Sequence, residues 1–341
     1  MPLYRNYWVL EIAQGVKAFF RIEAGVTRGQ ASEIPQPSRT PSRKKPEQAR
    51  WRLRKEHQRG FQPHPPGAVK EEGVNPENII WIFGTARVGS TWLSSMMKGL
   101  EGHSRWNEPL VGTLFGNHRL WNTHDQREAF IFSPSYKETW LRSIRSFVLD
   151  GANARYSEKM SEGYLVIKEP NGSRGAPWLI EALPESRMIS LIRDPRDVVA
   201  SMLDGRRRGG WAHAEESKAD TDPDAFVEKE ANTYVRNVGS AMRAYDAHEG
   251  RKALVRYEDL REDTLGTMKR IYSALEIAVG EKDLARVVNK HSWESIPEEK
   301  KGKGKLRRKA TPGGWKGDLT PQQVQIVEKA TAPWIEKFYA K

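Results

Sequence analysis

Short apolar runs alternate with longer amphipathic segments along the chain from about residue 78 onward. The runs are rich in Ile, Leu, Val and aromatic residues and stop at glycine or charged residues, which predicts buried strands over residues 79–83, 163–170, 187–193 and 252–257. Apolar positions at helical spacing predict helices over residues 92–100, 136–150, 177–183, 195–203, 223–248, 264–275, 282–289 and 320–339. This alternation predicts an α/β fold, in which a mostly parallel central sheet is flanked by helices.

The first 77 residues differ from the rest in pattern. Residues 1–26 place aromatic and aliphatic side chains on one face, which predicts an amphipathic helix that packs on its own domain, on a second subunit or weakly on a membrane surface. Residues 27–77 are basic and proline-rich, which is typical of an extended linker. Its charge could bind a polyanion, but it lacks the interleaved aromatic residues of a nucleic-acid stacking platform. We therefore expect no sequence-specific nucleic-acid partner, and a folded domain over residues 78–341.

Composition narrows the chemistry. The net charge of +12 favours an anionic ligand or surface. The chain has no cysteine, which excludes disulfides, thiolate metal sites and a cysteine nucleophile, and its eight histidines are scattered, so we expect no metal. No apolar run is long enough to span a bilayer, and the N-terminus lacks the layout of a secretory signal. We expect a cytoplasmic protein, with peripheral membrane attachment through residues 1–26 as the alternative.

A loop with glycine near each end, from Gly84 to Thr91, joins the first predicted strand to its helix. Such a loop forms an anion site, because the free N–H groups and the dipole of the helix point at the bound group. The spacing is that of a phosphate-binding P-loop, but Ser90 stands where a nucleotide hydrolase carries lysine. The cation is instead Arg87, inside the loop, which argues against hydrolysis of ATP or GTP. A glycine turn without a ligand is the alternative interpretation.

Two further stretches have the character of anion sites. Arg193 ends the third predicted strand, and Ser201 lies eight residues later in the helix that follows. A cation beside a helix N-terminus suits an anion, and open α/β sheets bind ligands in such crevices. Residues 307–316 are basic, rich in glycine and include Trp315, which favours a lid over an anionic ligand. Together they indicate a nucleotide with phosphates at two separate positions.

These stretches resemble motifs of the sulfotransferase family, which uses 3′-phosphoadenosine 5′-phosphosulfate. Residues 85–93 are similar to the family's 5′-phosphosulfate loop, and residues 191–201 to its 3′-phosphate motif. Residues 255–260 are similar to its Y-E-D-L segment, and residues 308–316 to its C-terminal R-K-G-x-x-G-D-W-K motif. The four motifs occur in the family's order across residues 78–338. The resemblance implies a sulfotransferase-like catalytic domain with a P-loop-like architecture.

The resemblance also implies roles for the matching positions. It implies that the 5′-phosphosulfate is held by Arg87, Val88, Gly89, Ser90 and Thr91. The adenine would lie by Trp92 and Tyr257. The 3′-phosphate would be bound by Arg193, Ser201, Arg308, Lys309 and the backbone of Ala310. The sequence departs from the family pattern in three ways. Arg87 stands where cytosolic members have lysine, and two lid positions, Ala310 and Gly314, differ from the motif. The chain also lacks the K-T-H segment with its catalytic histidine.

The missing histidine leaves the base to be found elsewhere. Sulfuryl transfer needs a deprotonated acceptor hydroxyl or amine, and positive charge where the leaving phosphate gains negative charge; arginine and N–H groups can supply that charge without a metal. Glu108 is the favoured base, since its segment resembles the catalytic glutamate segment of tyrosylprotein and some bacterial carbohydrate sulfotransferases. Glu169, which ends the second strand, is the alternative, and Lys168 beside it could stabilise the transferred group. His103 and His124 are weaker candidates.

Two other classes of function compete with this interpretation. A P-loop-like nucleotide phosphotransferase would carry lysine after Gly89, which is missing. A polyanion-binding protein on an inactive scaffold would need only the basic linker. The sequence leaves the acceptor open as a carbohydrate, a lipid or a small molecule. Aromatic residues between Trp106 and Trp140 could line its pocket or belong to the core, and residues 206–208 could meet an acidic sugar.

Overall fold

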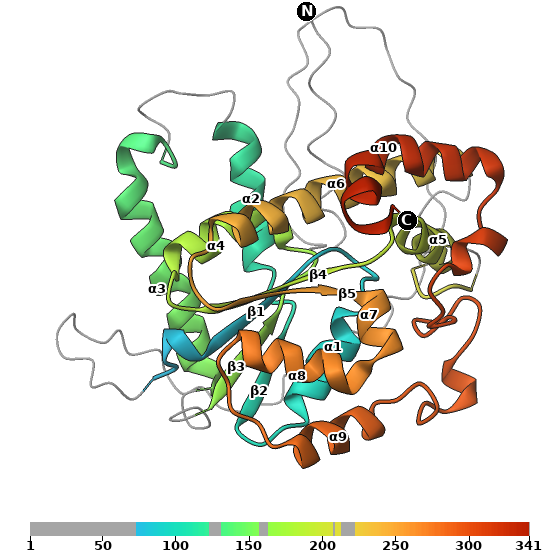
Figure 1. Cartoon of the computed structure of the whole chain (residues 1–341). Coiled ribbons are helices and arrows are strands. Elements are labelled where there is room, and N and C mark those ends of the chain that lie inside the picture. Colours follow the sequence, from blue (N-terminus) through green and yellow to red (C-terminus); the bar gives the residue numbers. More distant parts are fainter. Residues whose placement is uncertain (1–72, 123–130, 157–162, 207–208, 213–221, 341) are drawn as a thin grey trace, which may run out of the picture. The chain divides into compact units, whose positions relative to one another are not determined.

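The computed structural model describes residues 73–122, 131–156, 163–206, 209–212 and 222–340 (Figure 1). The predicted N-terminal helix, the linker up to residue 72 and His124 lie outside these ranges. None of the helices in the described ranges has the length and apolar character needed to cross a membrane.

The centre of the fold is a sheet of five parallel strands in the order β2-β3-β1-β4-β5. The strands are β1 (Ile79–Phe83), β2 (His103–Asn107), β3 (Tyr164–Lys168), β4 (Arg187–Ile192) and β5 (Lys252–Arg256). The predicted fold class is confirmed, and the four predicted strands are present. Strand β2 was not predicted, because this edge strand is only half-buried and carries no apolar run.

Alternating side chains of the strands face two separate cores. Ile80 and Ile82 of β1 pack against α1 (Ser90–Lys98), α8 (Thr264–Ala274) and α9 (Glu281–Lys290). Their neighbours Ile79 and Trp81 pack on the other face, against α3 (Lys137–Tyr156) and α4 (Ala176–Ala182). The long helix α6 (Pro223–Ala247) contributes to both clusters. Figure 1 shows the helices on the two sides of the sheet.

The remaining elements of the described ranges are four helices and several short turns. The helices are α2 (Val111–Asn122), α5 (Pro195–Arg206), α7 (Tyr257–Glu262) and α10 (Pro321–Tyr339), which packs on α5 and α6. Short 3-10 turns are η1 (Pro76–Asn78), η2 (Pro134–Tyr136), η4 (Ser173–Gly175), η5 (Glu298–Lys300) and η6 (Gly314–Gly317). Helix α5 extends three residues beyond the predicted end at Leu203, and Arg206 stacks over the ring of Phe226 at 4.6 Å.

Candidate active site

The loops that follow β1 and β3 leave the sheet in opposite directions. The chain after β1 enters α1, which belongs to one core, whereas the chain after β3 enters α4, which belongs to the other. Because β1 and β3 are neighbours, their carboxyl ends form a topological switch point, where open α/β sheets leave a crevice for a ligand. The predicted glycine loop and the two candidate glutamates all lie at this edge of the sheet.

The glycine loop ends as an open helix N-terminus. Gly89 precedes α1 with φ 93° and no side chain caps the helix, so no side chain competes with an anion for the N–H groups at its start. The ring of Tyr257 lies directly on Gly89, since a Cβ there would come within 2.6 Å of it. Trp92 contacts the same ring at a centroid distance of 6.2 Å, which brings the two predicted adenine residues together. Val88 is fully buried in the core, so it can contribute only its backbone.

The side chain of Arg87 reaches the second predicted phosphate site. Its Nε donates to Ser201 Oγ at 2.9 Å, its Nη2 donates to the carbonyl oxygen of Leu306, and its guanidinium lies 4.8 Å from the ring of Trp211. The structure thus joins the glycine loop, α5 and the C-terminal loop at one point. The contact between residues 87 and 201 spans 114 positions and could not be found from either motif alone.

Arg193 is held on three sides. Its Nη1 donates to the carbonyl oxygen of Arg87 at 3.1 Å, its guanidinium lies 4.2 Å from the ring of Tyr257, and its Nη2 is 3.7 Å from Asp197. Its Nε is buried and has no hydrogen-bond partner in the described part of the chain. A buried donor without a partner is costly, so this atom points to a ligand that completes the site.

The C-terminal loop is fastened to α5 by a residue that the sequence analysis missed. Asp197 is fully buried and accepts hydrogen bonds from the backbone N–H groups of Gly313, at 2.8 Å, and Trp315, at 2.9 Å. In the same loop, Arg308 and Lys309 both pair with Asp318, at 2.8 and 2.9 Å. The lid motif is therefore docked beside Arg193, and its two cations share one carboxylate.

The three arginines Arg87, Arg193 and Arg308 repel one another. Burial, together with the charges of Arg193 and Arg308, lowers the pKa of Arg87 to about 10. A cavity of about 340 Å³ lies next to this cluster and is lined by residues that include Asp204, Lys303 and Arg308. Converging buried cations of this kind fit an anion that carries more than one charge.

Two of the predicted catalytic residues, Glu108 and Lys168, form a second cluster. The ammonium of Lys168, a buried side chain, contacts a carboxylate oxygen of Glu108 and lies 3.2 Å from Thr91 Oγ1. The other oxygen of Glu108 accepts from Asn171 Nδ2 at 2.8 Å. Glu108, Lys168 and the start of α1 therefore meet at the crevice. The sequence analysis did not single out Asn171.

Glu169 has a different environment from Glu108. Its side chain is fully buried, and its Oε2 accepts from the backbone N–H of Leu110 at 3.0 Å. Burial raises the pKa of Glu169 to about 7. The side chain of Glu108, by contrast, is 28% exposed beside the glycine loop.

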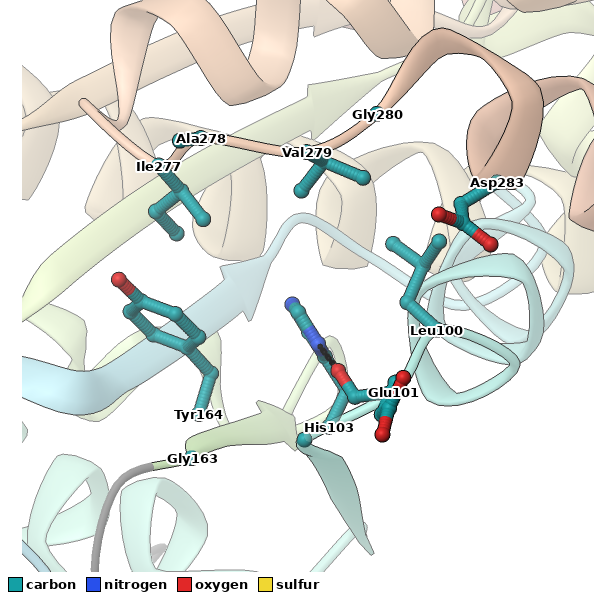
Figure 2. A pocket seen from close by; sticks show the side chains of 11 residues that line it. Leu100, Glu101, His103, Gly163, Tyr164, Ile277, Ala278, Val279, Gly280 and Asp283 are labelled. Atoms are coloured by element: carbon teal, nitrogen blue, oxygen red, sulfur yellow. Dashed lines mark hydrogen bonds between the residues drawn. The ribbon is translucent and has the colours of Figure 1, made fainter.

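A second cavity, of about 220 Å³, lies at the opposite edge of the sheet (Figure 2). It is bounded by the starts of β2 and β3 and by the loop between α8 and α9. His103 lies there, with Nδ1 at 2.8 Å from the carbonyl oxygen of Glu101 and Nε2 at 3.2 Å from the hydroxyl of Tyr272. Because His103 begins β2 and Glu108 follows its end, His103 is not placed to act at the crevice.

This fold and its clustered cations define an α/β anion-binding protein of the kind that handles nucleotides. Residues 77–339 match the sulfotransferase domain family, and the chain therefore belongs to that family. It is a sulfotransferase by its domain, and its reaction class is sulfuryl transfer. No curated protein matches the chain.

Several solved structures are similar to this chain. Mouse sulfotransferase SULT7A1 complexed with PAP has 15% identity and a TM-score of 0.51, with 79% of this chain and 91% of that chain covered. Sulfotransferase STF9 from Mycobacterium avium has 15% identity and a TM-score of 0.48, with 79% and 78% covered. Retinol dehydratase, in complex with androsterone and inactive cofactor PAP, has 15% identity and a TM-score of 0.45, with 79% and 83% covered.

Proposed function

We propose that this sulfotransferase moves a sulfuryl group from 3′-phosphoadenosine 5′-phosphosulfate to a hydroxyl or amine of its acceptor, with Glu108 as the base. The observation that carries the proposal is the convergence of Arg87, Arg193 and Arg308 beside Ser201, together with the unpartnered Nε of Arg193. The N–H groups at the start of α1 form one anion site, and Arg193, which follows β4, forms a second with Ser201 of α5. Two sites on separate strand–loop–helix units suit a nucleotide with phosphates at both its 3′ and 5′ positions.

The residues present fit such a nucleotide. The N–H groups that follow Gly89 would hold the 5′-phosphate, and Arg193 with Ser201 would hold the 3′-phosphate. The adenine would lie by Trp92 and Tyr257, whose rings already contact each other. When bound, the donor supplies a sulfuryl group that is attached to a phosphate. This phosphate is the leaving group when the sulfuryl group is transferred. The solved relatives with PAP bound agree with this donor.

The catalytic cluster supports Glu108 as the base. Its carboxylate is partly open to the crevice and can take the proton from an acceptor hydroxyl, whereas Glu169 is fully enclosed. Lys168 lies between Glu108 and Thr91, so its ammonium can face both the proton acceptor and the negative charge that develops on the leaving phosphate. Asn171 fixes the second oxygen of Glu108 and so restricts the direction of the carboxylate.

The surface beside Glu108 favours an acceptor with an apolar portion next to its hydroxyl. The side chains of Leu110 and Leu114 are 48% and 49% exposed there. They lie on one side of α2, because the N–H of Leu114 donates to the carbonyl oxygen of Leu110 at 3.0 Å. Two aromatic residues of this region do not add to that surface, since Trp140 lies in the core and Trp106 packs against it.

Binding and turnover experiments test the donor and the base separately. We expect calorimetry to give a PAP affinity at least about tenfold higher than that of ADP, because only PAP has a 3′-phosphate for Arg193. Equal affinities would contradict the two-phosphate site. Transfer of labelled sulfate to a panel of alcohols and amines would then identify the acceptor. In the same assay, Glu108→Gln should lose most turnover while retaining PAP binding; near-normal turnover would show that Glu108 is not the base.

A further inference from the structure

The turn that carries Glu108 has an unusual backbone. Glu108 has φ 48° and Leu110 has φ 63°, so two residues with side chains adopt the left-handed region on either side of Pro109. The left-handed region is unfavourable for residues other than glycine. Contacts with the surrounding structure must therefore hold the two residues in this conformation. The base proposed above therefore sits in a strained turn between β2 and α2.

Lys168, which ends β3, and Glu169, which follows it, hold this turn. The N–H of Glu108 donates to the carbonyl oxygen of Lys168 at 2.8 Å. The N–H of Leu110 donates to Glu169 Oε2 at 3.0 Å, and the nearby amide of Gly112 at the start of α2 also favours the ionised carboxylate. The backbone of Lys168 thus fixes the first strained residue, and the carboxylate of Glu169 fixes the second.

Glu169 itself is fixed by the segment that follows it. It is fully buried, and its Oε1 lies so close to Gly172 that a Cβ there would come within 2.0 Å of it. The same segment supplies Asn171, which donates to Glu108, and Ser173, whose hydroxyl accepts from the N–H of Gly84 at 2.8 Å. One short stretch therefore touches both the turn of the base and the start of the glycine loop.

We propose that Glu169 is a positioning residue, whose buried carboxylate holds the amide of Leu110 and thereby keeps Glu108 aimed at the acceptor. It does not touch the reacting atoms. The inference rests on Glu108 being the base in the proposed function, and it assigns the second candidate glutamate a separate task.

The charge state of Glu169 makes this task depend on pH. Burial raises its pKa to about 7; the carboxylate of Glu108 also raises it, whereas Lys168 and the amides of Leu110 and Gly112 lower it. The ionised carboxylate is the better acceptor for those amides. As the pH falls through about 7, Glu169 becomes protonated and its hold on the turn weakens. The rate should therefore fall on the acid side near this pH.

The test compares Glu169→Gln with the full-length wild type. We expect kcat to fall about 10- to 100-fold, as misplacement of a catalytic group does, with PAP affinity unchanged within about twofold. The acid limb of the kcat profile near pH 7 should disappear, because glutamine does not titrate there. Gly172→Ala, which pushes on the same carboxylate, should lower kcat in the same way. Glu181→Gln is the control, since this acid pairs with Lys137 on the surface.

The outcomes separate this inference from the proposed function. Wild-type kcat and an unchanged acid limb in Glu169→Gln, with Glu108→Gln inactive, would overturn the positioning role alone. Loss of PAP binding together with kcat would also overturn it, because Glu169 would then support the whole domain. If Glu108→Gln remains active, the proposed base itself fails.

Discussion

Asp318 forms ion pairs with the two cations of the lid motif that are predicted to bind a 3′-phosphate. We therefore expect Asp318→Asn to tighten PAP binding. Its Oδ2 accepts from Arg308 Nη1 at 2.8 Å, and Lys309 Nζ lies 2.9 Å from its Oδ1. A phosphate that reaches these two groups must displace or share a carboxylate that already neutralises them. The prediction depends on the proposed binding of PAP.

The exposure of the three side chains sets the size of the effect. The Arg308 side chain is 8% exposed, that of Asp318 is 19% and that of Lys309 is 46%. A half-exposed ion pair contributes about 0.2–1 kcal/mol, and the largely buried bond from Arg308 contributes about 1.5–3 kcal/mol. Asparagine still accepts from Arg308, so we expect a net gain of about 1–2 kcal/mol, which corresponds to a PAP Kd about 5- to 30-fold lower.

Isothermal titration calorimetry with PAP and ADP measures this change directly. ADP lacks the 3′-phosphate, so its Kd should change little. Glu328→Gln is a matched control, because it removes a carboxylate that pairs with Arg196 at 2.9 Å outside the lid motif. If Asp318→Asn weakens PAP binding, then Asp318 orients Arg308 and Lys309 for the phosphate, and the reasoning from competition is wrong.

Two further substitutions probe the cofactor site. Gly89→Ala should destabilise the domain by about 1–3 kcal/mol in chemical denaturation, because alanine is strained at φ 93° and its Cβ would lie 2.6 Å from the ring of Tyr257. Unchanged stability would mean that the ring of Tyr257 can move away from the added methyl group without cost. Arg193→Met should raise the Kd of PAP about 10- to 100-fold and that of ADP less, since both nucleotides lose the bond that steadies the loop at Arg87, whereas PAP alone also loses charged hydrogen bonds to its 3′-phosphate. Equal losses for both nucleotides would place Arg193 elsewhere on the ligand.

The sequence predicted the fold well because buried parallel strands are continuous apolar runs. The strands β1, β3, β4 and β5 were found for this reason, and the prolines at the first positions of α5, α6 and α10 located the starts of those helices. The edge strand β2 and helix α2 were missed, because their sequences alternate neither at period two nor at helical spacing clearly enough to be assigned. The short helix α7 was also missed, because its first residue, Tyr257, was assigned to the preceding strand and the rest to no element.

The site was predictable as separate motifs but not as one arrangement. Spacing identified Arg87, Arg193 and Arg308, yet only the tertiary structure brings Arg87 to Ser201 and makes the three cations neighbours. Burial separated the two glutamates, and sequence could not do so, because both precede a proline and both follow a strand.

Residues with strained backbone are concentrated at these motifs. Charged residues of the site hydrogen-bond to this strained backbone, which is a structural role in addition to any contact with the ligand. Five residues other than glycine have positive φ in the described part of the chain, and four belong to the site: Arg87, Glu108, Leu110 and Ala310. Three of these four are held at their own backbone by a charged side chain from a distant segment. Arg193 donates to the carbonyl oxygen of residue 87, Glu169 accepts from the N–H of residue 110, and Arg261 donates to the carbonyl oxygen of residue 310. Such strain persists only when the surroundings fix it. Some charged residues therefore both fix a strained loop and face the ligand. Such a residue couples ligand binding to the conformation of the loop. A local sequence pattern cannot reveal this coupling, because the two segments are distant in the chain.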